Sequence, residues 1–349
     1  MKQFFLRQWF LITLFILLPV GGLLGQSVPG LSESVGQYVN TGYLVFFILF
    51  GMSITLPTGK LWETASQPTS ILLAIVVSIV ILPLITWGVV LLFSLKSFSA
   101  GLLIMSAVPT TLASAAVWTR KAGGNDAIPL MATLLGNAFC FLTIPFWLGL
   151  TLGQTLPIDI WSLMSRLLIV AVLPMGLAQI LRAIPVVGKK ADAHKVSISM
   201  LSQIGILIII MISAIRTGPI FQEQSGKISL QQISLVIVLC GFIHGIGLWS
   251  GWGLTRLLRG NCEDAIGVAF SGSQKTLAIA IDLTTSPILL ATGISPLAII
   301  PPLIFHALQL IIDTVMIAKF RQTCSDTDVK MSPQPTHSNA AESISTDLK

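Results

Sequence analysis

The chain has 349 residues, of which 54% are hydrophobic and 10% are charged, and its mean hydropathy is +0.88. Soluble proteins carry about 25% charged residues, so the composition excludes a soluble globular protein and indicates an integral membrane protein. The net charge of +6 does not indicate a nucleic-acid partner. The basic residues lie in short segments between apolar runs, which is the pattern of membrane topology.

The apolar runs predict an all-α integral membrane protein with ten transmembrane helices. A spanning helix needs about 20 apolar residues. The first run is not followed by a small-residue cleavage site, so we expect a transmembrane helix there and not a signal peptide. The ten predicted spans are residues 4–24, 38–57, 70–94, 98–118, 127–152, 161–183, 196–216, 230–255, 264–284 and 292–319.

The distribution of Lys and Arg predicts the orientation. If the N-terminus is cytoplasmic, 15 of these residues fall in cytoplasmic segments and three (Lys96, Arg216 and Lys227) in outer loops. This bias places both termini in the cytoplasm, and we expect the cell (inner) membrane. A transporter domain is expected at residues 1–321. The polar residues 322–349 cannot bury enough apolar area to fold, so we expect a disordered cytoplasmic tail.

Ten spans divide into two halves of five, about residues 1–153 and 158–321. Because five is odd, a duplicated unit would be inverted relative to its twin. The fourth member of each half carries an interruption: Pro109 removes a helix hydrogen bond in one, and Gly272 with its polar neighbours loosens the other. Paired interruptions point to a transporter's binding site. The alternative is that both residues only kink packing helices.

Lys275 lies near the middle of the ninth predicted span, where a charge is costly and suggests a functional role. We expect its ammonium to act as a fixed cation that orders the crossing of the two interrupted helices and attracts an anionic solute. Proton exchange at this amine is a further expectation. The alternative is a structural ion pair, with Asp282 or Asp313 as the partner.

Other polar side chains cluster around the two interruptions and on the last span. His306, Gln309 and Asp313 form one helical stripe, and His306 could equally make a structural hydrogen bond between helices. His244 is expected to pack helices, and Asn125 and Asn137 to cap the fourth-span interruption. The predicted solute-binding residues are Thr110, Thr111, Ser114, Thr133, Asn137, Ser271, Ser273, Gln274, Lys275, Thr276, His306 and Gln309.

We expect no cofactor, no metal site and no catalytic group. The four cysteines lack metal or redox spacing and are expected to be free thiols that pack: Cys140, Cys240, Cys262 and Cys324. A membrane-embedded enzyme is an alternative, but Glu263 and Asp264 have no companion histidine or acidic repeat. A receptor without transport activity is another.

Three segments resemble the bile acid:sodium symporter superfamily, in its divergent symporter-like branch. Pro-Thr-Thr-Leu-Ala-Ser-Ala at 109–115, with Gly-Gly-Asn at 123–125, resembles the fourth-helix signature. Gly-Ser-Gln-Lys-Thr-Leu-Ala at 272–278 is similar to the ninth helix, and Pro-Leu-Ile-Phe-His-Ala-Leu-Gln-Leu at 302–310 to the last. The resemblance implies a panel domain and a core domain, crossed discontinuous helices four and nine, and alternating access.

The sequence departs from this resemblance at two sodium ligands. Ala115 stands where sodium-coupled members have asparagine, and no acidic residue lies between Asp264 and Asp282. A residual sodium site would have Ser114, Thr133 and Gln274 as ligands. We therefore expect a transporter of an organic anion, bile-acid-like or a small carboxylate, that is not sodium-coupled by the usual route. The alternative is a sodium- or proton-coupled symporter of a neutral or sulfated solute.

Overall fold

The computed structural model describes residues 2–57, 68–93, 95, 97–112, 114–153, 155–224 and 229–331. Every regular element in these ranges is a helix, as the predicted all-α class requires. The first half contains α1 (Lys2–Ser27), α2 (Leu31–Tyr38), α3 (Thr41–Ile54), α5 (Pro68–Val76), the π-helical η1 (Val77–Ile81), α6 (Leu82–Leu92), α7 (Ser99–Ala107), α8 (Ser114–Ala122), α9 (Ala127–Ala138) and α10 (Cys140–Thr151).

The second half ends in a helix that is longer than expected. Helix α19 runs to Met331, so residues 322–331, which we placed in the tail, are helical, and residues 332–349 lie outside the described residues.

The second half contains α11 (Ile160–Leu167), the π-helical η2 (Leu168–Val172), α12 (Leu173–Arg182), α13 (Pro185–Ala193), α14 (Lys195–Gln224), α15 (Leu230–Leu257), α16 (Cys262–Ser273), α17 (Leu277–Thr284), α18 (Pro287–Leu290), the 3-10 helix η3 (Pro296–Ile299) and α19 (Ile300–Met331).

Among the described residues, five helices are long and apolar enough to cross a membrane: Pro68–Leu92, Ile160–Arg182, Lys195–Ile220, Leu230–Leu257 and Pro296–Cys324. The count is six if α9 and α10, which meet at 67°, form one bent span. The other four predicted spans correspond to shorter apolar helices, α1 and α3, and to two interrupted pairs, α7 with α8 and α16 with α17.

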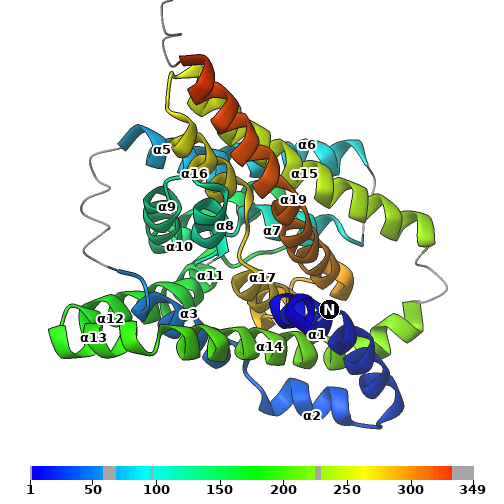
Figure 1. Cartoon of the computed structure of the whole chain (residues 1–349). Helices are drawn as coiled ribbons and strands as arrows, with labels where there is room; N and C mark the ends of the chain where they lie inside the picture. Colours follow the sequence, from blue (N-terminus) through cyan, green and yellow to red (C-terminus); the bar gives the residue numbers. More distant parts are fainter. Residues whose placement is uncertain are drawn as a thin grey trace, which may run out of the picture.

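The helices pack in two groups (Figure 1). Helix α1 packs along α14, and α3 packs against both α12 and α14, in the lower part of the view. Helix α16 packs against α15, α5, α8 and α9, and α19 against α15, α8 and α7, in the upper part. Helix α17 contacts α3 and α14 from the first group and α7 and α19 from the second. The second half of the ninth predicted span therefore lies where the two groups meet.

Several helices begin at residues whose side chains cap the free N–H groups of the first turn. Asn40 accepts a hydrogen bond at the start of α3, and Asn261 does so for α16. Ser229 and Gln232 form a reciprocal capping box at the start of α15. These polar caps mark where the chain leaves a loop and enters an apolar helix.

The expectation of four free thiols is wrong for one pair. Cys262 in the first turn of α16 forms a disulfide with Cys324 on α19, with a Cα–Cα distance of 5.7 Å. The two residues are 62 positions apart, so no local spacing motif announces the bond, and only the packing of α16 near α19 brings them together. Cys140 and Cys240 are free and buried, as expected.

Candidate functional site

Both predicted interruptions are breaks between helices. Residues 108–112, which contain Pro109, lie between α7 and α8 and are called the fourth-span break. Residues 274–276 lie between α16 and α17 and are called the ninth-span break. Gly272 remains helical, so this break follows the glycine instead of including it. Backbone groups freed in this way must be satisfied by protein, water or a ligand, because lipid offers no partner.

The two breaks satisfy part of each other's backbone. The Thr276 N–H donates to the Pro109 carbonyl at 2.9 Å. The Thr110 hydroxyl donates to the Ser271 carbonyl at 2.5 Å, and the Ser78 hydroxyl lies 3.2 Å from the Thr110 hydroxyl. The bonds of Thr276 with Pro109 and of Thr110 with Ser271 join segments more than 160 residues apart in sequence and hold the two breaks side by side.

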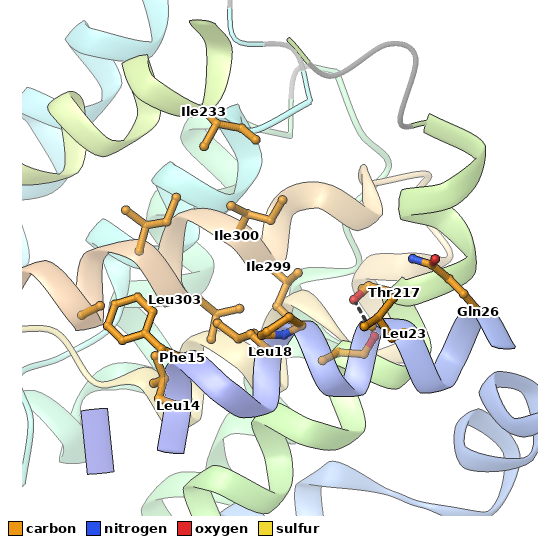
Figure 2. Close-up of a pocket in the computed structure, with 15 residues that line it drawn as sticks. Leu14, Phe15, Leu18, Leu23, Gln26, Thr217, Ile233, Ile299, Ile300 and Leu303 are labelled. Carbon is orange, nitrogen blue, oxygen red and sulfur yellow. Dashed lines mark hydrogen bonds between the residues drawn. The ribbon is translucent and has the colours of Figure 1, made fainter. Parts of the chain in front are cut away.

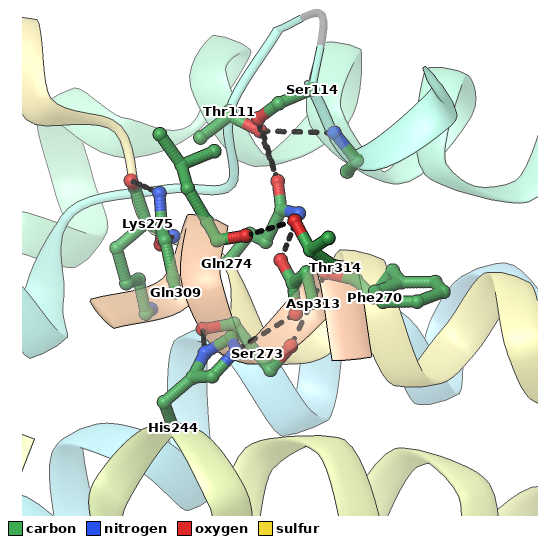
Figure 3. A network of polar contacts seen from close by, with 12 residues as sticks. Thr111, Ser114, His244, Phe270, Ser273, Gln274, Lys275, Gln309, Asp313 and Thr314 are labelled. Carbon is green, nitrogen blue, oxygen red and sulfur yellow. Dashed lines mark hydrogen bonds and ion pairs between the residues drawn. The ribbon is translucent and has the colours of Figure 1, made fainter. Parts of the chain in front are cut away.

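Gln274 connects the breaks to the last helix (Figure 3). Its Oε1 accepts hydrogen bonds of 2.7 Å from the hydroxyls of Thr111 and Ser114. Its Nε2 donates to the Asp313 carboxylate on α19 at 2.5 Å. Since Gln274 is fully buried, its amide acts as a bridge between the start of α8 and α19.

The Lys275 ammonium is held by oxygen atoms only. Its Nζ donates to the Ser78 carbonyl at 2.6 Å and to the Val108 carbonyl at 3.0 Å, and lies 3.1 Å from the Ser78 hydroxyl. The side chain is 2% exposed. A buried ammonium requires such partners, because desolvation without hydrogen bonds is very costly.

Two prolines explain why these carbonyls are free. In η1 the Leu82 N–H donates to the Val77 carbonyl, and Pro83 has no N–H to offer to Ser78. At the end of α7, Pro109 ends the helix, so the Val108 carbonyl has no following helical turn. Each proline thus leaves a carbonyl that Lys275 satisfies.

The alternative considered for Lys275, a structural ion pair with Asp282 or Asp313, is not formed. Asp282 accepts hydrogen bonds of 2.6 and 3.0 Å from the Arg166 guanidinium, and Asp313 bonds to His244 and Gln274. Asp282 lies two helical turns beyond Lys275, but the ninth-span break separates them, so helical spacing does not bring their side chains together.

His244 belongs to the site although sequence reasoning assigned it only to helix packing. Its Nε2 lies 2.9 Å from the Asp313 carboxylate, and its Nδ1 lies 3.3 Å from the Ser273 carbonyl at the end of α16. The sequence shows a histidine on one apolar span and an aspartate on another. It does not show that the two spans are in contact, so it could not predict this pair.

Gln309 and His306 support the ninth-span break from α19. The Lys275 N–H donates to Gln309 Oε1 at 2.9 Å, and Gln309 Nε2 donates to the Lys275 carbonyl at 3.2 Å. The same Nε2 lies 2.9 Å from His306 Nδ1. In the predicted stripe on the last span, Gln309 therefore contacts the break directly and His306 contacts Gln309.

The remaining predicted residues satisfy backbone groups. Thr133 donates to the Thr111 carbonyl at 3.1 Å, and Asn137 to the Thr110 carbonyl at 3.3 Å. Asn137 thus supports the fourth-span break as expected, whereas Asn125 bonds to Asp264 at 2.9 Å. The hydroxyls of Ser271 and Ser273 bond within α16, to Gly267 and Phe270 respectively.

A cavity of about 280 Å³ borders the breaks on the side of α1, α3 and α14. Of the twelve predicted site residues, four line it: Thr111, Ser114, Thr276 and His306. The other lining residues are Phe10, Met52, Leu112, Val117, Trp118, Lys121, Ser199, Ser202, Gln203, Ile206, Leu277, Ala278 and Leu310. Lys275 is not among them, because its ammonium points into the packing around η1.

The N-terminal ends of two helices and one lysine border the cavity. The first residues of α8 and α17 both border it, and a helix N-terminus carries partial positive charge and free N–H groups. No side chain caps α17. Of the described residues that line the cavity, none is acidic, and the exposed Lys121 lies at the end of α8, 4.4 Å from the Trp118 ring centroid.

A second cavity, of about 510 Å³, lies further along the α1, α14 and α19 interface (Figure 2). Its lining is mostly apolar, with Leu14, Leu18 and Leu303 on its walls and Gln26 and Thr217 at one end. It contains none of the predicted site residues. The apolar side chains that line this cavity would accommodate an apolar ligand or lipid chain better than a charged one.

In the described part of the chain, no three His, Cys, Asp or Glu residues come together as metal ligands. The oxygens that we considered for a residual sodium site, on Ser114, Thr133 and Gln274, are engaged in protein hydrogen bonds. We therefore assign no metal ligand.

Comparisons with known proteins show the family to which this chain is similar. A sequence profile of the SBF-like CPA transporter family matches residues 8–322. The probable sodium/metabolite cotransporter BASS4, chloroplastic, of Arabidopsis thaliana is 25% identical over 244 residues, which cover 68% of this chain and 55% of that protein. This chain thus spans just over half the length of that relative.

Two other relatives are covered more fully. The uncharacterized sodium-dependent transporter YocS of Bacillus subtilis is 26% identical over 292 residues, 82% of this chain and 84% of that protein. Sodium/bile acid cotransporter 7 of Xenopus tropicalis is 23% identical over 324 residues, 89% and 91% of the two chains. These proteins are named as transporters and not as enzymes, as we predicted for this chain. Together with the apolar helices, the profile match identifies this chain as a multi-pass integral membrane protein of the SBF-like CPA transporter family.

Proposed function

We propose that this protein carries small organic anions across the membrane by alternating access, and that the cavity beside the two breaks is its solute site. The observation that carries the proposal is that two interrupted helices direct their N-terminal ends at one cavity without an acidic wall residue. Helix N-termini bind anions through free N–H groups and the helix dipole. The solute's carboxylate would lie near Leu277 and Ser114.

The size of the cavity favours a small carboxylate over a bile-acid-like solute. Ligand sites enclose about 300–1,000 Å³, and the volume of about 280 Å³ here lies just below that range. The Thr276 hydroxyl on the wall would orient polar groups of the solute, whereas the hydroxyls of Thr111 and Ser114, which also line the cavity, donate to Gln274. Lys121 adds a positive charge at the edge.

Lys275 has a structural role in this proposal, as a cation fixed to the chain. Its ammonium lies among three oxygens at 2.6–3.1 Å, a set of ligands that would also suit a monovalent cation. Because it holds the Val108 carbonyl, it fixes the position of both breaks. This supports transport that does not depend on sodium in the family's usual way. The amine acts on the solute by ordering the helix ends and not by direct contact.

The packing supports movement of two bodies. The proposal includes ten spans in two inverted five-helix repeats, with the α7–α8 and α16–α17 spans crossing. The α1, α3, α12 and α14 group would serve as the panel domain and the other helices as the core domain, with both termini in the cytoplasm and the protein in the cell (inner) membrane. The site lies where the groups meet, so their relative movement would expose it to either side.

Uptake into proteoliposomes tests the proposal. Purified protein is reconstituted and supplied with labelled pyruvate, succinate or taurocholate, in sodium chloride or choline chloride. We expect uptake of a small carboxylate above that of empty vesicles, at equal rates in the two salts. A strict sodium requirement contradicts the coupling proposal, and uptake of taurocholate alone contradicts the size argument. If thermal unfolding shows that the reconstituted protein is folded and no anion is taken up, the proposed function is contradicted.

A further inference from the structure

His244 and Asp313 form a buried pair behind the ninth-span break. His244 lies on α15 and Asp313 on α19, and both side chains are fully buried. Both ring nitrogens face oxygen atoms: Nε2 is 2.9 Å from Asp313 Oδ1, and Nδ1 is 3.3 Å from the Ser273 carbonyl (Figure 3). The other Asp313 oxygen accepts from the Gln274 amide. The pair therefore contacts the residues on both sides of the point where α16 ends.

The hydrogen bonds determine how many protons the pair holds. A carbonyl oxygen only accepts, so His244 Nδ1 must carry a hydrogen to bond Ser273. The contact between Nε2 and Asp313 then needs a second proton. That proton resides either on Nε2, facing an ionised carboxylate, or on the carboxyl, facing a neutral imidazole. Both arrangements contain one proton more than a neutral histidine beside a carboxylate.

We propose that His244 and Asp313 form a proton-binding site whose occupancy is coupled to the ninth-span break, so that protons drive the transport proposed above. This inference deepens the proposed function and rests on it. Release gives one proton to water and leaves a neutral imidazole and a carboxylate. The single remaining ring N–H cannot serve both Ser273 and Asp313. Loss of the proton therefore frees either the last carbonyl of α16 or the carboxylate that Gln274 contacts.

The neighbouring charges do not replace this proton. The pair is neutral when loaded and carries one negative charge when unloaded, which is costly inside a membrane unless the site opens or changes its contacts. Six titratable side chains on the packed elements contact other groups: Lys275 contacts Ser78 and Val108, His306 Gln309, Asp264 Asn125, Asp282 Arg166, Lys121 Trp118 and Lys319 Trp249.

Hydrogen exchange of the whole protein in lipid nanodiscs, between pH 6 and pH 9, tests this coupling without any solute. Exchange times are corrected for the intrinsic pH dependence of the chemistry. In the native protein we expect amides of residues 274–276 and of the last turn of α16 to lose protection as the pH rises. The loss should be the same in sodium chloride and in choline chloride.

The Asp313→Asn variant provides the decisive comparison. Its side-chain amide can donate to His244 Nε2 and its carbonyl can accept from Gln274, so it reproduces the loaded pair without a titratable proton. We expect protection that does not change with pH. If Asp313→Asn does not fold, His244→Gln, which also removes the proton site, takes its place in the comparison. Glu263→Gln, at the exposed start of α16, is the matched control and should respond as the native protein does.

A pH-independent native protein, or an Asp313→Asn variant with the native pH response, overturns the proton site. The proton site is also overturned if adding sodium at a fixed pH removes the loss of protection in the native protein, because the site would then exchange a metal ion. In proteoliposomes that contain pyranine, uptake of pyruvate should acidify the lumen with the native protein and not with Asp313→Asn. If pyruvate is taken up without acidification, coupling is overturned. If no anion is taken up while the exchange result stands, the solute proposal fails and the proton site survives.

Discussion

Arg166 and Asp282 form a two-point ion pair that joins α11 to α17. The guanidinium Nε and Nη2 lie 3.0 and 2.6 Å from the two carboxylate oxygens. The Asp282 side chain is 1% exposed and that of Arg166 15%, so water screens the pair little. Because α17 is the second half of the interrupted ninth span, this pair fixes the break from its far side, while Lys275 and Gln309 hold it from within.

Replacement of Arg166 by alanine is expected to lower stability strongly. Removing one partner of a buried pair leaves an unpaired buried charge and costs about 3–5 kcal/mol. The measurement is thermal unfolding of purified protein in detergent. Arg120→Ala, which breaks the exposed pair with Asp126, is the control and should cost about 0–1 kcal/mol. Equal effects of the two substitutions would contradict this assignment.

Removal of the Lys275 ammonium should create a site for sodium. In Lys275→Ala the carbonyls of Ser78 and Val108 lose their donor, and buried unsatisfied groups cost about 1–3 kcal/mol each. A monovalent cation can replace the ammonium, as carbonyl oxygens do for ions in channels. We expect the variant to unfold at a lower temperature in choline chloride and to recover part of the loss in sodium chloride.

The native protein and Lys319→Ala, which removes an exposed lysine on α19, should show no such difference between the two salts. If sodium stabilises the native protein as much as it stabilises Lys275→Ala, the ammonium does not occupy a cation position. The role proposed for Lys275 would then be wrong, although the hydrogen bonds around it remain.

Gln309 should be needed for the shape of the ninth-span break. Its amide satisfies both the N–H and the carbonyl of Lys275, and Gln309→Met leaves both groups buried without that partner. The expected cost is about 1–3 kcal/mol for each unsatisfied group, measured by thermal unfolding. Thr314→Val, on an exposed position of the same helix, should have little effect. A native-like Gln309→Met would mean that other groups replace this amide.

The sequence predicted the breaks because Pro109 has a local effect that needs no partner: it lacks an N–H wherever it lies. The predicted interruption at Gly272 and its polar neighbours includes the observed break at 274–276, but Gly272 itself stays helical. Gly272, which is part of α16, packs against Val77 of η1. The helix ends one residue later, and beyond it Gln274 bonds to Asp313 and the Lys275 N–H bonds to Gln309.

The partners of the buried charges could not be predicted, because they depend on which helices touch. The sequence left Asp282 and Asp313 open as partners for Lys275, but in the structure Asp282 pairs with Arg166 and Asp313 contacts His244 and Gln274. The π-helical turn that presents Ser78 depends on Pro83, whose effect on a carbonyl five residues earlier has no signature in the hydropathy pattern. His244 and Asp313 lie 69 residues apart, and only the contact of α15 with α19 joins them.

Lys121 should affect the affinity for an anionic solute and not the rate of its movement. The exposed ammonium lies at the edge of the cavity, 4.4 Å from the Trp118 ring, where its field reaches a bound carboxylate but is screened by salt within about 10 Å at 0.1 M. We expect Lys121→Gln to raise the KM for the transported carboxylate several-fold with an unchanged maximal rate, and added salt to reduce the difference from the native protein. Lys121→Arg keeps the charge and should remain close to native. If Lys121→Gln lowers the maximal rate at an unchanged KM, the residue acts on the conformational change, and the solute does not bind beside it.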